Sequence, residues 1–183
     1  MQRFREGRVE DSLEDFDAAI ELEPRVAPFM WQRGLSLYYA ERFEEGSQQF
    51  RKDVAVNPND TEEALWAFLC EARLPSVGLQ GAREGLLAVG KDRRPYMRTA
   101  YETFAGRASE EDLAMEAHRP GAGEREEFYT NLYLGLYAEA RGDTPLARAY
   151  VTSAAKSSYA SSSGDYMGPL AIVHARLRGW STT

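Results

Sequence analysis

The first hydrophobic pattern in the chain has the spacing of one helix face. Apolar residues recur every three or four positions over about residues 8–23, at Val9, Leu13, Phe16, Ala19 and Ile20. This period predicts an amphipathic helix, and one side of its stripe can pack against Met30 and Leu37 of the following segment. Helical patterns continue along the rest of the chain, and no segment has the alternation that predicts a strand.

Several positions in this pattern repeat with a period of 34 residues. Three pairs of residues have this separation: Ser12 with Gly46, Phe16 with Phe50, and Pro24 with Pro58. It is the length of the tetratricopeptide repeat, a pair of packed helices. The period predicts a partial repeat unit over about residues 1–24 and a full unit over about residues 27–58.

The residue types in the full unit have a physical cause. A helical hairpin needs small residues where its helices touch, and we expect Gly34 and Gly46 at these crossings, with Tyr38 beside them. A large residue, Phe50, fills the space between neighbouring units. Pro58 ends the second helix because proline has no N–H group to donate.

A third unit is predicted over about residues 128–159. Gly135 stands twelve residues before Ala147, as Gly34 stands twelve before Gly46. The further matches are Leu134 before the glycine, a turn at 141–143, core residues Val151 and Ala154, and Tyr159 in place of the closing proline.

Between these units the chain keeps helical patterns but leaves the repeat. Asp60 can cap a helix that runs to about Leu74, with Glu63 at the capping-box position. Ser109 can cap a later helix that ends near His118. The other predicted segments are breaks at 75–78, 119–123 and 161–164, and helices over about 81–89, 95–105 and 165–178.

These elements predict a single all-α domain over residues 1–183, with non-consensus helices over 60–118 and a C-terminal helix over 165–178. A length of 183 residues suits one domain, and 43% hydrophobic residues supply its core. We expect an α-solenoid of tetratricopeptide-type hairpins, with about ten helices in a right-handed superhelix.

Six motifs follow one another along the chain: WQRGLSLYY at 31–39, NPNDT at 57–61, LW at 65–66, ASEEDL at 108–113, NLYLG at 131–135 and RGD at 141–143. In this order they resemble the bacterial lipoprotein NlpI family. The segments FLCEA at 68–72 and 165–180 are more similar to uncharacterised tetratricopeptide-like proteins of plants and algae, many of them predicted to be chloroplastic. The family resemblance implies a dimeric adaptor that presents substrates to proteases and peptidoglycan hydrolases. This chain has no cysteine near its start for a lipid anchor, since Cys70 lies in mid-helix.

Charge and composition narrow the classes of partner. The formal net charge is −7, and the two dense basic stretches, at 91–94 and 176–178, are short. Phosphate binding needs clustered Lys and Arg, so we expect no nucleic-acid partner. No apolar run approaches the roughly 18 residues of a membrane span, and the first residues have no secretory pattern.

The chain offers few residues for chemistry. Cys70 is the one cysteine and lies in an apolar helical stretch, which predicts buried packing. We expect His118 at a helix end and His174 half-exposed on the last helix. Adjacent carboxylates such as Glu62 and Glu63 point about 100° apart on a helix, which favours solvated faces over an acid/base pair. The sequence therefore predicts no catalytic, metal or cofactor site and no enzymatic activity.

The first helix of each unit is expected to line a concave surface. The candidate protein-binding residues there are Trp31, Leu35, Tyr38, Leu132 and Leu136. None is basic, so a clamp for the C-terminal carboxylate of a partner is not expected. Two fillings of an apolar groove stay open, namely the protein's own helices and an apolar partner helix.

The partial unit at the N-terminus predicts self-association. Its first helix is expected to begin before residue 1, which leaves only about residues 1–5 of it and exposes part of the next helix. The candidate self-association residues are Val9, Leu13, Phe16 and Ile20. A second copy of the chain, as a homodimer, or native residues upstream would cover this end. Alternatively, Arg5 and Arg8 cover it in a monomer.

The function that these patterns favour is a protein-binding adaptor or assembly scaffold, with other proteins or peptides as partners. The alternative is a structural subunit bound permanently in a larger complex. The resemblance alone favours the chloroplast as the compartment.

Overall fold

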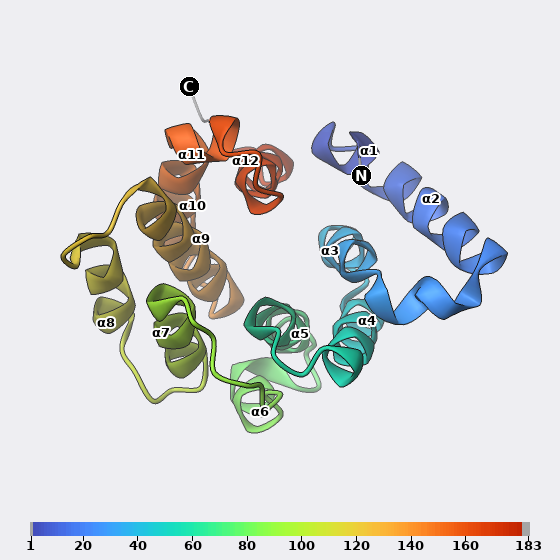
Figure 1. Cartoon of the computed structure of the whole chain (residues 1–183), viewed down its shortest axis with the longest axis horizontal. Helices are drawn as coiled ribbons and strands as arrows, with labels where there is room; N and C mark the ends of the chain where they lie inside the picture. The colour runs from blue at the N-terminus through green and yellow to red at the C-terminus, as the bar shows by residue number, and fades with distance from the viewer. Residues whose placement is uncertain (1, 181–183) are drawn as a thin grey trace. The chain divides into compact units, whose positions relative to one another are not determined.

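The computed structural model describes residues 2–180, which form helices joined by turns and loops (Figure 1). The chain divides into two compact units, residues 1–92 and residues 93–183, where the sequence pattern predicts one domain. The division falls within an irregular stretch, residues 85–94, part of which is predicted as helix.

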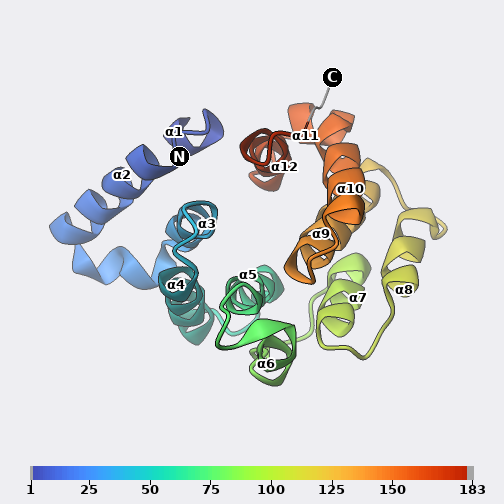
Figure 2. The ribbon, with the colours of Figure 1, turned by 180° about the vertical axis from the view of Figure 1, so that it is seen from behind.

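The first unit is a series of helices in which neighbours along the chain pack on each other. Its elements are α1 (Gln2–Arg5), α2 (Val9–Leu22), the 3-10 helix η1 (Pro24–Phe29), α3 (Trp31–Tyr39), α4 (Phe43–Val56), α5 (Thr61–Ala72) and α6 (Gly78–Glu84). α2 contacts α3, α3 contacts α4, α4 contacts α5, and α5 contacts α6. The close pair α3 and α4 can be followed from behind in Figure 2.

The hairpin of α3 and α4 closes around a glycine. A Cβ atom added to Gly34 would lie 2.6 Å from Cζ of Phe50, so a larger residue cannot fit here without displacing the ring. A Cβ atom added to Gly46 would likewise lie 2.9 Å from Sγ of Cys70 on α5. In the turn between α3 and α4, Glu41 takes a left-handed conformation with φ of 59°. The predicted close contacts at both glycines are confirmed.

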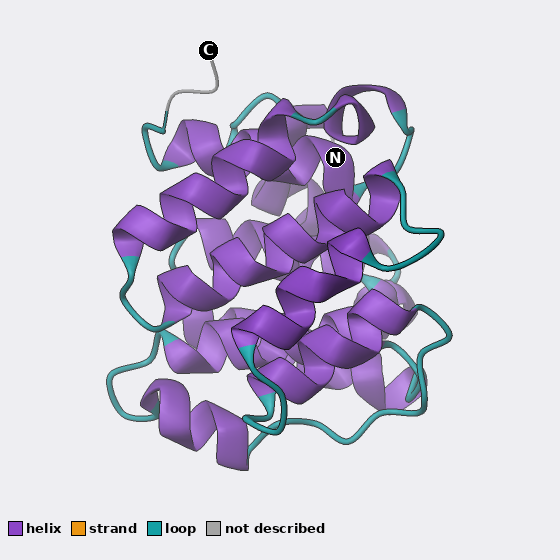
Figure 3. Ribbon diagram, turned by 90° about the vertical axis from the view of Figure 1, so that its left-hand side faces the viewer, coloured by secondary structure: helices purple, strands orange, loops and turns teal. Residues whose placement is uncertain are grey.

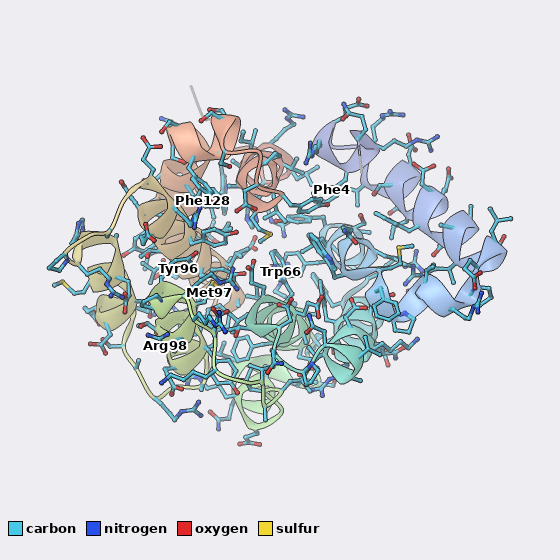
Figure 4. The ribbon with its side chains drawn as sticks, in the orientation of Figure 1. Phe4, Trp66, Tyr96, Met97, Arg98 and Phe128 are labelled. Carbon is cyan, nitrogen blue, oxygen red and sulfur yellow. The ribbon has the colours of Figure 1, made fainter. Side chains whose placement is uncertain are left out.

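Aromatic side chains fill the core of the first unit. The ring of Trp66, on α5, lies 5.2 Å from that of Tyr38 and 6.2 Å from that of Phe50, and all three are fully buried (Figure 4). Phe4 of α1 is also buried, with its ring 5.5 Å from Tyr39 of α3. The short α1 therefore adds a core residue to the N-terminal end of this unit.

The second unit contains the late hairpin. Its elements are α7 (Pro95–Phe104), α8 (Glu110–Met115), the 3-10 helix η2 (Glu116–His118), α9 (Glu124–Ala140), α10 (Thr144–Lys156), α11 (Ser158–Ser162) and α12 (Met167–Leu177). α9 packs against α10 and α7, and α10 packs against α12. Tyr96 and Met97 enter the core from α7, and Phe128 enters it from α9 (Figure 4).

A glycine also sets the distance between α9 and α10. A Cβ atom added to Gly135 would lie 2.6 Å from Cγ2 of Val151 and 3.0 Å from its backbone nitrogen. The turn before α10 has Gly142 at φ of 87°, and Asp143 caps α10 by accepting a hydrogen bond from the backbone N–H of Leu146 at 3.1 Å. The turn predicted at 141–143 is confirmed.

The all-α class is confirmed, since the described residues contain no strand (Figure 3). There are more helical segments than the ten expected, partly because α1, α8 and α11 have only 4, 6 and 5 residues. The helix predicted over 81–89 corresponds to α6, which begins at Gly78 and ends at Glu84. Gly85 is its C-cap, and the carbonyl oxygen of Gly85 accepts a hydrogen bond from Arg51 at 3.0 Å. The last helix spans Met167–Leu177 within the predicted 165–178. The solenoid and its right-handed superhelix stay predictions.

Candidate binding cleft

Four of the five predicted protein-binding residues belong to the core. Leu35, Tyr38, Leu132 and Leu136 are fully buried, so the prediction that they line an open surface is wrong. The reason is visible at Tyr38, whose ring packs edge-on against Phe43 at 5.5 Å, across the α3–α4 hairpin. Helical spacing identified an apolar face correctly, but neighbouring helices cover that face. The fifth residue, Trp31, is partly exposed.

The predicted self-association surface is also covered within the chain. Val9, Leu13 and Phe16 are buried, and Ile20 is half-buried. The cover comes from α1, α3 and η1, which all contact α2. The expected open end of the repeat array is therefore not found at these residues, because even the one-turn α1 folds back onto α2.

Trp31 leads to a cleft in the first unit where four helix ends meet. The cleft lies between the end of η1, the start of α3, the C-terminal part of α4 and the start of α5, and its volume is about 260 Å³. Its lining residues are Pro28, Phe29, Trp31, Asp53, Val56, Asn57, Asp60 and Glu63. We call this site the α4–α5 cleft.

The rim of the α4–α5 cleft is apolar and exposed. Phe29 is 64% exposed and Val56 is 47% exposed, and together with Trp31 they give the cleft an apolar edge. Phe29 is held out by the 3-10 helix η1, which begins and continues with prolines. The side chain of Gln49 fastens η1 to α4 by donating a hydrogen bond to the carbonyl oxygen of Ala27 at 2.7 Å.

The floor of the cleft consists of two buried carboxyl groups. Asp53 on α4 is 1% exposed and Glu63 on α5 is 8% exposed. Asp53 Oδ1 accepts a hydrogen bond from Gln49 Nε2 at 3.1 Å, but Asp53 Oδ2 and Glu63 Oε2 have no hydrogen-bond partner. Buried polar atoms in folded proteins are nearly always paired, so these two oxygens are exceptions that need an explanation.

A third carboxylate, that of Asp60, is occupied by the start of α5. Its Oδ1 accepts hydrogen bonds from the backbone N–H groups of Glu62 at 3.0 Å and Glu63 at 3.2 Å. Its Oδ2 accepts one from Asn57 Nδ2 at 3.3 Å. Asp60 is thus the helix cap that the sequence predicts, while it adds a negative charge to the cleft.

The electrostatics of the floor follow from burial and crowding. Burial raises the pKa of Asp53 to about 7, and the Asp60 charge adds to the rise against the opposing effects of Gln49 and Lys52. Burial also raises the pKa of Glu63 to about 8, with further contributions from Asp60, Asp53 and Glu62. Both carboxyl groups therefore hold protons far above the pH at which exposed carboxyl groups lose them.

Sequence reasoning missed this floor. The pattern places Glu63 in a capping box and on a solvated face, but its side chain is buried in the cleft. Asp53 is not among the predicted site residues, although its place in the sequence carries a signal of burial. It follows Phe50 by three residues and precedes Val54, so it lies on the apolar stripe of α4. A charged residue on a core-facing stripe is the pattern that finds such a site.

The other residues considered for chemistry, Cys70 and His174, are buried in the cores of their units. Cys70 is buried as predicted, and burial raises the pKa of its thiol. His174 is fully buried and not half-exposed, because its ring lies 5.3 Å from that of Trp180 and its Nε2 lies 3.6 Å from Glu139 Oε2. Among residues 2–180, no group of three or more His, Cys, Asp or Glu side chains is arranged to hold a metal ion.

Two wider comparisons complete the description of the chain. Within the described part, none of the helices has the length and apolar character needed to cross a bilayer. The resemblance to the NlpI family and to plant and algal proteins stays a prediction. No protein-family model matches this chain.

Proposed function

We propose that this chain is a non-catalytic adaptor or scaffold that holds a segment of a partner protein in the α4–α5 cleft. The observation that carries the proposal is a pair of buried carboxyl oxygens without a hydrogen-bond partner, on Asp53 and Glu63, two of the residues that line the cleft. Leaving such a group unpaired costs about 1–3 kcal/mol, and a bound partner that donates to it would recover that cost.

The exposed rim supports a protein partner. Phe29, Val56 and Trp31 present apolar and aromatic surface around a polar centre. Aromatic anchors around a small number of directed polar groups are typical of protein interaction sites. The cleft is also smaller than the roughly 300–1,000 Å³ of most small-molecule sites, which favours the side chain of a larger ligand.

The α9–α10 hairpin indicates that a buried acid at the position of Asp53 is not needed for folding. Asp53 follows the crossing glycine Gly34 by 19 residues, and Ala154 follows Gly135 by the same number. Ala154 is fully buried, so an apolar residue serves at this position of a helical hairpin. A carboxyl group kept at a place where alanine suffices favours a role in binding.

A peptide display experiment tests the proposal. A random peptide library would be selected on the purified chain, and recovered peptides would be tested against a Phe29→Ser, Trp31→Ser double variant. Met115→Ser is the matched control, because Met115 is 65% exposed and lies in the second unit. We expect peptides that bind the parent and the control but not the cleft variant.

Recovered peptides that bind all three proteins equally would contradict this proposal. The alternative function, a permanently bound structural subunit, predicts a different result with the native protein. It would co-purify with one partner at fixed stoichiometry and would not exchange that partner for added peptide.

A further inference from the structure

We infer that the α4–α5 cleft recognises the basic side chain, lysine or arginine, of a partner segment, with the cationic head on Asp53 and Glu63 and the stem along Trp31 and Phe29. This inference rests on the proposed function and specifies the chemistry of its ligand.

The charge of the cleft is complementary to a cation. Three of its eight lining residues, Asp53, Asp60 and Glu63, carry carboxyl groups, and none of the eight is basic. The nearest influence of opposite sign is Lys52, an exposed residue on the outer side of α4. A cation would neutralise the charge of Asp60 and the charges that Asp53 and Glu63 acquire when they lose their protons, whereas an anionic or neutral ligand would leave them uncompensated.

Once Asp53 and Glu63 have lost their protons, their unpaired oxygens require donors and not acceptors. An ionised carboxylate only accepts hydrogen bonds, and Asp53 Oδ2 and Glu63 Oε2 each lack one. An ammonium group brings three N–H donors and a guanidinium group brings five, so either can serve both oxygens at once. Hydrogen bonds between ionised partners are about twice as strong as neutral ones, which makes a basic side chain the best match.

The rim suits the rest of such a side chain. Trp31 is the aromatic residue with the strongest attraction for cations, and Pro28 and Phe29 continue the apolar wall beside it. Lysine and arginine have long aliphatic stems that pack along apolar surface while the charged head reaches a polar group. The apolar rim of the cleft matches the aliphatic stem, and the carboxyl groups of the floor match the charged head.

Binding should release protons. The empty site holds protons on Asp53 and Glu63 near neutral pH, because burial raises both pKa values and the charges of Asp60 and Glu62 add to the rise. Lys52 on α4 is the cation that opposes the rise in the pKa of Asp53. The side chains that η1 and α3 contribute to the cleft are uncharged. A bound cation favours the ionised carboxylates, so affinity should increase as the pH rises from about 6 to about 8.

The direct test uses three small probes. The amides of N-acetyl-lysine, N-acetyl-arginine and N-acetyl-norleucine would be titrated into the nitrogen-15-labelled chain, with the indole N–H signal of Trp31 as the reporter. We expect saturable shifts with the two basic amides and at least about tenfold weaker binding of the norleucine amide. Binding of the basic amides should be tighter at pH 8 than at pH 6 and should release protons in calorimetry.

Variants confirm the location. Asp53→Asn and Glu63→Gln keep side-chain shape and should each weaken the basic amides about tenfold. Glu111→Gln, an exposed acid in the second unit, is the matched control and should change nothing. Equal binding of the norleucine amide, or no shift of the Trp31 signal with either basic amide, would overturn the inference.

The two proposals can fail separately. If display yields cleft-dependent peptides without lysine or arginine, the adaptor function stands and the choice of ligand is wrong. If the basic amides bind but no peptide depends on the cleft, the cation site stands and the adaptor function is wrong.

Discussion

The carboxyl groups at the α4–α5 cleft of the first unit and the half-buried Asp165 of the second unit have opposite environments. In the first unit, Asp53 and Glu63 each leave one oxygen unpaired at the α4–α5 cleft. In the second unit, Asp165 Oδ2 accepts hydrogen bonds from the hydroxyl groups of Tyr159 at 2.6 Å and Tyr129 at 2.8 Å, and its Oδ1 accepts one from the backbone N–H of Met167 at 3.0 Å.

The pKa shifts of these carboxyl groups have opposite signs. Burial raises the pKa values of Asp53 and Glu63 to about 7 and about 8. Burial also acts to raise the pKa of Asp165, but the hydrogen bonds from Tyr159, Met167 and Tyr129 outweigh it and hold that pKa below its ordinary value. Asp165 is thus a charged fastener between α9, α11 and α12, whereas the pair in the first unit has acceptor capacity left for a ligand.

The largest expected effect tests whether the two units share a hairpin design. Gly34→Leu should lower the free energy of unfolding by about 3 kcal/mol or more, because overpacking costs about 1–3 kcal/mol and the Cβ alone already meets the Phe50 ring at 2.6 Å. Urea unfolding followed by circular dichroism measures the change. An unchanged midpoint for Gly34→Leu would refute the assigned repeat register.

Such crossings were predictable because they depend on local pattern. A glycine at a fixed sequence separation from a large residue, as Gly34 is from Phe50, predicts a close contact between the two helices of a hairpin. The caps at Asp60 and Ser109 were also readable, and both side chains accept from the backbone as expected. Of these two caps, the one at Ser109 forms the full capping box, whereas Glu63 lines the cleft instead of bonding back to Asp60.

The cleft could not be predicted because it depends on which neighbour covers which face. Leu35 and Trp31 lie one helical turn apart on α3, yet the first is core and the second lines the α4–α5 cleft. The one-turn helix α1 is too short for periodicity to detect, and it places Phe4 over the N-terminal end of the first unit. Burial of Asp53 follows from its position after Phe50 only once α4 is packed against α5.

The next effect tests the fastener. Asp165→Ala removes the acceptor for Tyr129 and Tyr159 and should lower the free energy of unfolding by about 1–3 kcal/mol at pH 7. Tyr159→Phe, which removes one of the donors, should cost less, and the double variant should show strong coupling between the two sites. Additive losses in urea unfolding would mean that the hydrogen bonds do not hold this end of the unit together.

A change of opposite sign is expected in the first unit. Asp53→Asn should raise the free energy of unfolding at pH 8 by about 1–2 kcal/mol, because the folded parent must there ionise a buried acid. Since the pKa of Asp53 is raised from 3.8 to about 7 on folding, the folded state binds the proton more tightly. The parent should therefore lose stability as the pH rises from about 4 to about 7, and the variant should lose less.

Measurement of unfolding free energies at pH 5 and pH 8 settles this sign. Glu63→Gln should behave alike over a window extending to about pH 8, where the raised pKa of Glu63 lies. If both variants destabilise the chain at pH 8 as much as Asp165→Ala does, the carboxyl pair of the cleft is structural and the contrast between the units disappears.

The smallest effect uses Cys70 as a reporter of the first unit. It is the one cysteine of the chain, it is fully buried on α5, and burial raises the pKa of its thiol, so a thiol reagent should label it only when this unit opens. Native labelling should be slow and should become fast in urea. Because Asp53→Asn stabilises the closed state at pH 8, it should slow labelling by about five- to thirtyfold, the rate equivalent of 1–2 kcal/mol. Glu111→Gln should leave the rate unchanged, and rapid labelling of the native parent would show that Cys70 is not the packed core residue that its position beside Gly46 requires.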